Sequence, residues 1–459
     1  MTSKTTVKMG LKQFLAASIT RRHPYLLMVF VALAVRVARI LIVRSYDIPL
    51  AVVPPPASFG DPHFGFGNEI GSIAHSIVTG HGFGSPFGPI TGPTAWIGPV
   101  YPYLCAGVFK IFGLFTPASA FVLLFLNSLF SAVTCIPLYQ ICERTVGRAS
   151  GLWAGWTWAL LPYFWLWPTF LIWETSLVAL LLAYLVLLTL QVADTTDLGG
   201  RNQWVRLGLL WGAALLTNPV LLTFLPVSCL WLAYRLRRES ARVLRSLALT
   251  LAACALVVTP WLVRNRLVFG QFVSIRSNFG FEFHLGNYHF SEGFGWGGKH
   301  PSMNKREREE YARMGEIAYV AAKRDEAITF VRHYPREFLD LTAKRFYAFW
   351  SGGMIPYGVG PLLPWLYGPF TLLTLLGILV AAWERINGVG LLIGLLLLFP
   401  LPFYIAFPQA RNRHTIEPVM LVLSVYFIVA LVRRLREKRE DIETPSMPKS
   451  VKESEYQRT

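Results

Sequence analysis

Two carboxylates stand out in a long segment of this chain that carries no cation. Residues 46–109 include no Lys or Arg, and their acidic residues are Asp47, Asp61 and Glu69. A carboxylate held beside a hydroxyl can act as a general base and remove its proton. Glu69 also begins a helical stretch, where the helix dipole favours an acid, and Asp61 lies between a glycine and a proline, a context typical of a turn. Both are therefore candidate catalytic residues with a simpler structural alternative.

Three cationic side chains lie close together near the C-terminal end, at Arg411, Arg413 and His414. They fall in a very short connection between two apolar runs, on the side where cations are normally scarce. A phosphate would explain the exception, because guanidinium groups bind phosphate oxygens in bidentate fashion. The alternative is a structural ion pair with Glu417, one helical turn further on.

Other ionisable side chains are weaker candidates for the same site. Glu174 is predicted at the outer end of an apolar run, where it either lines a pocket or reaches water. Arg36 and Arg39 lie one helical turn apart in the first apolar run, so they could meet a phosphate or balance Glu174. Glu282 and His284 are candidate ligands of a metal cation, although such a histidine among aromatic residues is more often a hydrogen-bonded loop residue.

The elements that must position these residues are membrane-spanning helices. The 459 residues are 54% hydrophobic and 15% charged, with a mean hydropathy of +0.45, which is too apolar for a soluble chain of this length. Runs of roughly 20 apolar residues, long enough to cross a bilayer, predict an all-α polytopic protein with about ten transmembrane helices. The spans are expected near 25–45, 117–141, 149–167, 171–192, 206–217, 219–234, 245–263, 362–384, 388–407 and 415–433.

Lys and Arg residues predict the orientation of these spans. They cluster before the first, after the sixth and after the last span, so these connections and both termini are expected in the cytoplasm. The first run contains Arg36 and Arg39 and lacks a small-residue cleavage site, which favours a retained anchor over a signal peptide. We therefore expect a cytoplasmic N-terminus at 1–24, a transmembrane domain at 25–435 and a disordered cytoplasmic tail at 436–459.

Two segments predicted outside the membrane are too long to be simple connections, and long ordered loops commonly carry function. The first outer loop, 46–116, contains one predicted helix at 69–79 with a single apolar stripe, which we expect to lie on the membrane surface. The large outer loop, 264–360, is predicted to hold two amphipathic helices at about 304–333 and 336–350. We expect it to cover the bundle without a separate core.

Several function classes are disfavoured by the same observations. The net charge of +17 arises from cations beside span ends, which does not indicate a nucleic-acid partner. All five cysteines lie in apolar runs without metal-ligand spacing. The glycine clusters at 80–84 and 293–297 do not follow a strand in a βαβ unit, so they do not predict a dinucleotide site.

The outer loops carry motifs that resemble a known group of membrane enzymes, the GT-C glycosyltransferases. The resemblance is to the protein O-mannosyltransferase-like (family 39) enzymes and the lipid A aminoarabinose transferase, and it extends over nearly the whole chain. Its residues are Glu69, Ala74, Gly80-His81-Gly82-Phe83-Gly84-Ser85-Pro86, Thr91-Gly92-Pro93-Thr94-Ala95-Trp96, Pro99-Val100-Tyr101-Pro102, Phe112-Gly113, Gly147, Pro162, Glu174, Pro260-Trp261, Arg264-Asn265, Leu285-Gly286-Asn287 and Arg411 to Pro418.

This resemblance implies a GT-C-type bundle and an inverting glycosyltransferase that takes its sugar from a polyprenyl-phosphate donor. In that group an acidic residue of the first outer loop is the base, a role for Glu69 or Asp61 here. The resemblance also implies substrate-binding roles for Tyr101 and Asn287, beside Arg411, Arg413, His414 and Glu174. In the aminoarabinose transferase a loop glutamate and a histidine hold a metal, but Trp96 stands at the glutamate position in this sequence.

We therefore expect an integral protein of a bacterial inner or cell membrane whose active site faces the periplasm or exterior. It would transfer sugar to a hydroxyl of a lipid, glycan or protein acceptor, in contact with membrane lipids and without nucleic acid. No cofactor is assigned with certainty, and a divalent metal ion is the one considered. Two other hypotheses stay open, a lipid-linked sugar flippase or permease, and an inactive GT-C scaffold that binds a partner enzyme.

Overall fold

The chain is all-α over the part that a computed structural model describes, residues 23–47, 64–194, 200–289, 291, 298–352 and 363–443. Within these ranges the remaining regular structure consists of short 3-10 turns and one isolated antiparallel bridge between Gly84 and Pro93. Asp61 lies outside the described residues. The predicted fold class is thus confirmed as helical.

Six helical stretches are long and apolar enough to cross a membrane, which supports an integral membrane protein. They coincide with six of the ten predicted spans. The stretches are Pro24–Val43 (α2), Pro117–Thr145 (α6, Pro117–Val133, with α7, Cys135–Thr145), Thr175–Ala193 (α10), Arg237–Phe269 (including α13, Ser240–Phe269), Pro364–Trp383 (within α18, Leu363–Trp383) and Glu417–Arg439 (within α22, Glu417–Glu443).

The other four predicted spans are shorter or broken helices. Proline explains most of the breaks, because it lacks an N–H and restricts the residue before it. The elements are α8 (Arg148–Leu160) and α9 (Pro162–Phe170), α11 (Arg201–Thr217), the 3-10 turn η3 (Pro219–Thr223) with α12 (Leu225–Arg235), and α19 (Val389–Leu398) with α20 (Leu401–Ile405). The count of about ten full-length spans is therefore not reached in the described residues.

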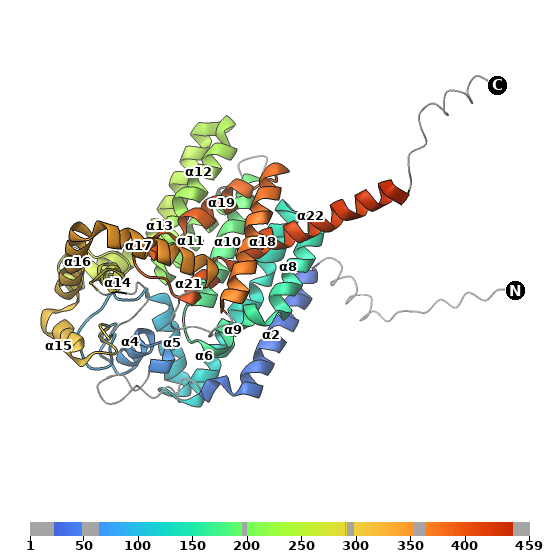
Figure 1. Ribbon diagram of the computed structural model, residues 1–459. Helices are drawn as coiled ribbons and strands as arrows, with labels where there is room; N and C mark the ends of the chain where they lie inside the picture. The colour runs from blue at the N-terminus through green and yellow to red at the C-terminus, as the bar shows by residue number, and fades with distance from the viewer. Residues whose placement is uncertain are drawn as a thin grey trace, which may run out of the picture.

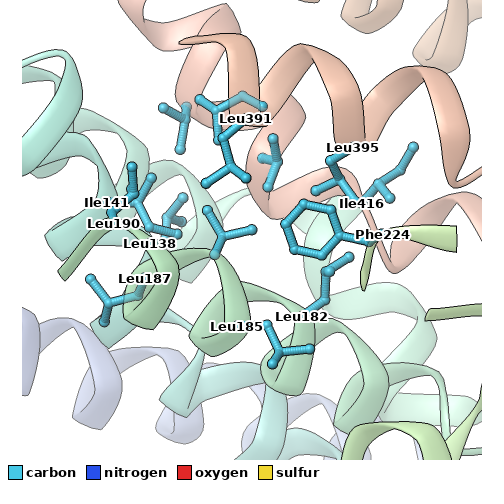
Figure 2. Close-up of a cluster of buried hydrophobic side chains, with 14 of the residues drawn as sticks. Leu138, Ile141, Leu182, Leu185, Leu187, Leu190, Phe224, Leu391, Leu395 and Ile416 are labelled. Carbon is cyan, nitrogen blue, oxygen red and sulfur yellow. The ribbon is translucent and has the colours of Figure 1, made fainter. Parts of the chain in front are cut away.

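The short helices are held by the core of the bundle. Figure 2 shows leucines and isoleucines of α7, α10 and α19 in one buried cluster. The ring of Phe224, which directly precedes α12, lies at one side of this cluster beside Leu395 and Ile416. The labelled side chains are all buried: Leu138, Ile141, Leu182, Leu185, Leu187, Leu190, Phe224, Leu391, Leu395 and Ile416. A helix surrounded in this way can be stable without the length that a span facing lipid requires.

Arg36 closes the break between α8 and α9. Its guanidinium donates to the carbonyl oxygens of Trp158 (3.0 Å) and Ala159 (3.2 Å), and its Nε donates to Ser131 Oγ (3.1 Å). Carbonyls in the last turn of a helix have no partner within the helix. Arg36 supplies one, and Arg39 donates instead to Thr169 Oγ1 (2.7 Å). Neither arginine contacts Glu174, so the prediction that they balance the charge of Glu174 is wrong.

The outer layer lies at one side of the bundle, with α4, α14, α15 and α16 grouped at the left of Figure 1. Its helices are α4 (Glu69–Val78), α5 (Val100–Phe112), α14 (Phe279–Gly286), α15 (Lys305–Met314), α16 (Glu316–His333) and α17 (Pro335–Ser351), followed further on by α21 (Ala410–His414). The predicted helix at 304–333 is divided at Gly315, whose φ of 78° is a left-handed conformation that suits glycine. The predicted break at Pro335 is confirmed.

Helix α4 is packed inside the protein. Its apolar residues Ile70, Ile73 and Ala74 are buried, and so are Glu69 and Ser72 on the other face. They share a second hydrophobic core with rings of the large outer loop, among them Phe281 and Tyr311. The expectation that this helix rests on the membrane surface is therefore wrong, because both of its faces contact protein.

A buried carboxylate, Glu316, joins the two outer loops. Four groups donate to it: Thr94 Oγ1, Ala95 N (2.7 Å), Ser277 Oγ (2.7 Å) and Tyr311 OH (2.8 Å). Arg264 adds hydrogen bonds to the carbonyl oxygens of Thr94 (2.7 Å) and Phe83 (2.8 Å). Burial raises the pKa of Glu316, and these hydrogen bonds oppose the rise. The large outer loop is thus a cover that shares its core with the first loop.

The C-terminal helix is longer than the apolar run predicts. Helix α22 continues to Glu443, which places the first residues of the tail predicted at 436–459 in a helix and corrects that boundary. Beyond the membrane segment Glu384 contacts Arg433 (3.1 Å) and Arg434 (2.7 Å), in the region expected to face the cytoplasm. Residues 1–22 and 444–459 lie outside the described part.

Candidate functional site

A cavity of about 560 Å³ lies between the outer layer and the bundle. Seven separate parts of the chain line it: α4 with Glu69, Ile97, residues 173–174, residues 218–223, residues 274–285, His300, and residues 402–412. Every one of these belongs to the side that the Lys and Arg pattern assigns to the exterior. The size is in the range of small-molecule sites.

Glu69 reaches this cavity from the first turn of α4. Its side chain is buried, and its Oε1 lies 3.2 Å from Nε2 of His300, also buried, in the large outer loop. Its Oε2 has no hydrogen-bond partner. A buried acceptor without a partner is costly, so one oxygen of this carboxylate is available to a bound group.

Arg411 lies on another wall of the same cavity, on the short helix α21. Its guanidinium carbon lies 3.8 Å from the ring centroid of Trp173, a cation–π geometry that holds the group in place. Burial lowers the pKa of Arg411, while the carboxylates of Glu174, Glu69 and Glu282 act in the opposite direction. The structure thus brings Arg411 of the cationic turn and Glu69 of the acidic loop to one cavity, and their roles there stay predictions.

Glu174 is a second buried carboxylate at the cavity. Its Oε1 accepts a long hydrogen bond from Asn218 Nδ2 (3.4 Å) and lies 3.9 Å from Nη1 of Arg276. Its Oε2 has no partner. Burial raises the pKa of Glu174, and Arg276 and Arg411 oppose this rise. Arg276 is itself anchored, since its Nε donates to the carbonyl oxygen of Trp96 (3.1 Å).

Glu282 and His284 do not converge, although both lie on α14. Glu282 lines the cavity, accepts from Asn278 Nδ2 (3.0 Å) and has a pKa raised by burial. His284 does not line it. Its Nδ1 lies 3.6 Å from Glu326 Oε2, yet burial and then the cations Lys323 and Lys299 lower the pKa of His284 to about 4. Because Glu326 is half exposed, its charge is screened and the ring is neutral at neutral pH.

Arg413 and His414 do not line the cavity and instead hold helix ends together. Arg413 donates to the carbonyl oxygen of Trp350 (2.9 Å), stacks 4.1 Å from the Tyr367 ring centroid and lies 3.9 Å from Glu417 Oε1. Nδ1 of His414 lies 2.7 Å from Glu417 Oε2. Arg413 thus pairs with Glu417, as the structural alternative predicts, His414 contacts the same carboxylate, and neither residue lines the cavity.

Asn287 and Tyr101 also hold structure and do not line the cavity. Asn287 donates to the Ile405 carbonyl oxygen (2.7 Å) and accepts from Arg345 (2.8 Å), which itself donates to the carbonyl oxygens of Gly286 (2.7 Å) and Ile405 (2.7 Å). These bonds tie the end of α14 to the end of α20. Tyr101 donates to Asn127 Oδ1 (2.8 Å) in the second core. Their contacts support the cavity wall, which corrects the substrate-binding roles implied by the resemblance.

Arg276 and His300 are cavity residues that were not predicted from the sequence. Both lie in the large outer loop, which contains many charged residues, so that one more arginine or histidine is not unusual there. Arg276 could have been selected as a candidate from the sequence, because it follows the Pro260-Trp261 motif in a segment predicted outside the membrane. His300 had no such signal, because its partner Glu69 comes from the first outer loop.

Among the described residues, no group of three or more His, Cys, Asp or Glu side chains is placed to hold a metal ion. Trp96, which stands at the metal-binding glutamate position of the aminoarabinose transferase, is fully buried against Phe87, Phe281 and Tyr311. The position is occupied by an aromatic core residue. The weak cation candidates Glu282 and His284 thus do not form a ligand pair.

The arrangement can bind an anion and remove a proton in one cavity. Arg411 and Arg276 provide donors for phosphate oxygens, and Glu69 provides an unpaired carboxylate oxygen. Glu174 and Glu282 provide acceptors for hydroxyl groups. Apolar side chains, among them Val220, Leu222 and Phe403, complete the lining.

Comparison with solved structures finds GT-C glycosyltransferases at low identity. One is the archaeal oligosaccharyltransferase AglB from Archaeoglobus fulgidus in complex with an inhibitory peptide and a dolichol-phosphate (14% identity, TM-score 0.48, 94% of this chain and 53% of that chain). Another is ArnT from Cupriavidus metallidurans bound to undecaprenyl phosphate (14% identity, TM-score 0.37, 90% of this chain and 81% of that chain). This chain spans about half the length of the archaeal enzyme. No family model and no curated protein matches it.

Proposed function

We propose that this protein is an inverting GT-C glycosyltransferase that moves a sugar from a polyprenyl-phosphate donor to a hydroxyl of a lipid, glycan or protein acceptor outside the membrane. The observation that supports this most is that Glu69 and Arg411, from distant parts of the chain, line one cavity with Arg276. A phosphate leaving group and an acceptor hydroxyl need this combination of charges.

In the proposed reaction the acceptor oxygen attacks the anomeric carbon of the sugar from the side opposite the phosphate. The new carbon–oxygen bond forms as the bond from that carbon to the phosphate oxygen breaks, and the acceptor proton passes to Glu69 Oε2. Arg411 and Arg276 stabilise the charge that develops on the leaving phosphate. The Trp173 ring keeps Arg411 in position for this role.

Glu174 and Glu282 are proposed to accept hydrogen bonds from hydroxyl groups of the bound sugar or acceptor. Glu174 suits this because its Oε2 is buried without a partner. Arg413, His414, Asn287 and Tyr101 contribute indirectly, through the contacts that hold the walls of the cavity. Asp61 stays a candidate base in the loop outside the described residues.

Sugar transfer in membranes containing the full chain tests the base. The donors would be a panel of undecaprenyl-phosphate hexoses and pentoses, with radiolabel followed into lipid, glycan and protein fractions. Glu69→Gln is expected to lower transfer by about 10²–10⁴-fold. Glu309→Gln is the matched control, because Glu309 is exposed and pairs with Lys305, one helical turn away. Full activity in both Glu69→Gln and Asp61→Asn would remove the proposed base.

Purified protein in proteoliposomes separates the proposal from its two rivals. If the protein moves an undecaprenyl-phosphate sugar across the bilayer without any acceptor, it is a flippase. If it neither transfers nor transports but copurifies with another enzyme, it is a scaffold. Transfer that requires an acceptor and leaves undecaprenyl phosphate behind supports the glycosyltransferase.

A further inference from the structure

A chain of hydrogen bonds leads from the large outer loop to Glu69. His300 Nε2 lies 3.2 Å from Glu69 Oε1, and on its other nitrogen, Nδ1, His300 meets Ser302 N at 3.2 Å and Ser302 Oγ at 2.7 Å. Ser302 Oγ in turn accepts from Asn68 Nδ2 at 2.9 Å. All four side chains are at least nine-tenths buried.

The backbone N–H of Ser302 determines which groups donate and which accept in this series of hydrogen bonds. A backbone N–H can only donate, so Nδ1 of His300 is an acceptor. In a neutral imidazole the hydrogen is then on Nε2, and that N–H donates to Glu69 Oε1. The Ser302 hydroxyl, which accepts from Asn68, has its own hydrogen free to donate to the same Nδ1.

Packing holds the His300 ring in this position. The rings of Phe87, Trp96 and Phe281 surround it edge-to-face, at centroid distances of 5.6, 6.3 and 5.3 Å. Edge-to-face contacts of this kind favour one ring orientation. His300 therefore presents its Nε2–H to Glu69 without depending on the hydrogen bonds alone.

The backbone beside Glu69 is strained. Asn68 has φ 50° and ψ −108°, a conformation that residues other than glycine rarely adopt. Such strain persists where the surrounding structure imposes it, commonly at functional sites. Here the bond from Asn68 to Ser302 and the contact of Glu69 with His300 tie both residues to the same short segment of the large outer loop.

We infer that His300 is the positioning residue of Glu69, and that the hydrogen bonds of Ser302, and of Asn68 through Ser302, hold His300 in place for this role. This rests on the proposed function, in which Glu69 is the base. The N–H from His300 occupies Oε1 and fixes the plane of the carboxylate, so that Oε2 alone faces the acceptor hydroxyl. Because Nδ1 already accepts from Ser302, the acceptor proton stays on Glu69 and does not pass to the imidazole.

Two variants of His300 test this. His300→Phe keeps an aromatic ring among its three neighbours but removes the donor, whereas His300→Gln keeps an amide N–H and an amide oxygen that can replace the two ring nitrogens. We expect His300→Phe to lower kcat about 10- to 100-fold with KM for the undecaprenyl-phosphate sugar unchanged. We expect His300→Gln to stay within a few fold of the unmodified protein.

A melting experiment in detergent tests the pair without any activity. His300→Phe is expected to lower the melting temperature clearly when Glu69 is present, since it leaves a buried carboxylate without its donor. In a Glu69→Gln background the same change should lower it much less. Equal effects in both backgrounds, or a KM that rises as much as kcat falls, would overturn the inference.

The two readouts separate the inference from the proposed function. If Glu69→Gln transfers sugar at the full rate, the base assignment fails, and the role of His300 in positioning a base fails with it. If Glu69→Gln is inactive while His300→Phe is fully active, the base stands and the positioning role is overturned. Coupled melting with loss of kcat in His300→Phe supports both.

Discussion

Glu316 and Glu69 are both buried carboxylates of the outer layer, but their surroundings differ in one decisive way. Glu316 receives four hydrogen bonds from both outer loops and has no oxygen without a partner among the described contacts. Glu69 has a partner on one oxygen only, and so does Glu174 across the cavity. A buried carboxylate whose two oxygens both accept hydrogen bonds stabilises the fold, whereas one with an oxygen that accepts none is available to a substrate.

The largest expected effect is a loss of sugar transfer in a Glu69 variant, compared with a loss of stability in the matching Glu316 variant. Glu69→Gln should lower transfer by about 10²–10⁴-fold while thermal stability changes little, because glutamine still offers Oε1 to His300. Glu316→Gln should instead cost about 1–3 kcal/mol of unfolding free energy, since its amide N–H cannot accept the bonds now made. Transfer assays and detergent melting curves on the same preparations check this, and a stable but inactive Glu316→Gln would contradict it.

A second test compares two arginines that lie two residues apart. Arg411→Ala should weaken the binding of undecaprenyl phosphate about 10- to 100-fold, the equivalent of a charged hydrogen-bonded contact of about 1.5–3 kcal/mol. Arg413→Met should leave the affinity of the folded protein unchanged and lower its melting temperature. Binding of the lipid to purified protein measures both, and equal losses of affinity would show that the cavity does not distinguish them.

Gly286 allows a smaller and purely steric test of the cavity wall. A Cβ at this position would lie 1.9 Å from the carbonyl oxygen of Ala406, which is part of the backbone. Gly286→Ala should therefore destabilise the protein by about 1–3 kcal/mol and shift the wall that Ala406 forms. Gly107→Ala is the control, because a Cβ there meets no atom within 4 Å. Similar melting temperatures for the two variants would contradict the close contact.

The smallest effect at neutral pH is expected at His284. Burial, Lys323 and Lys299 lower the pKa of His284 to about 4, so the folded protein binds fewer protons there than the unfolded chain between pH 6.5 and 4. Stability should fall as the pH decreases through this window. His284→Gln should reduce that fall and change little at pH 7. Melting curves from pH 7 to pH 4 measure it, and an unchanged slope would refute the shifted pKa.

The charges that sequence reasoning found share one property, which is that each is unusual for its segment. Glu69 is one of few charged residues in a long loop, Arg411 is a cation in a short outer turn, and Glu174 is at the end of a span. Local context was sufficient to select them. It could not separate Arg411 from Arg413, because two residues on a five-residue helix face different sides and only the packing decides which side is the cavity.

The missed residues depend on contacts between distant parts of the chain. The position of His300 is fixed by Glu69 and by three aromatic rings. These residues are distant from His300 in the sequence and contact it only in the folded protein. Asn287 and Tyr101 show the converse, since they lie in motifs but make structural contacts. For the fold, hydropathy located the spans, but it could not predict that short helices such as α19 are stable inside a packed core.

Arg36 has a consequence for the order of assembly during synthesis. It is on α2, the first span, but its partners Ser131, Trp158 and Ala159 belong to α6 and α8, which are made later. Inserting an arginine near a helix centre costs roughly 2.5–3.5 kcal/mol, which the apolar remainder of α2 must offset. When the first span enters the membrane, Arg36 can bond within its own helix, to the carbonyl oxygen of Ala32 (3.0 Å), and its other partners arrive later with α6 and α8.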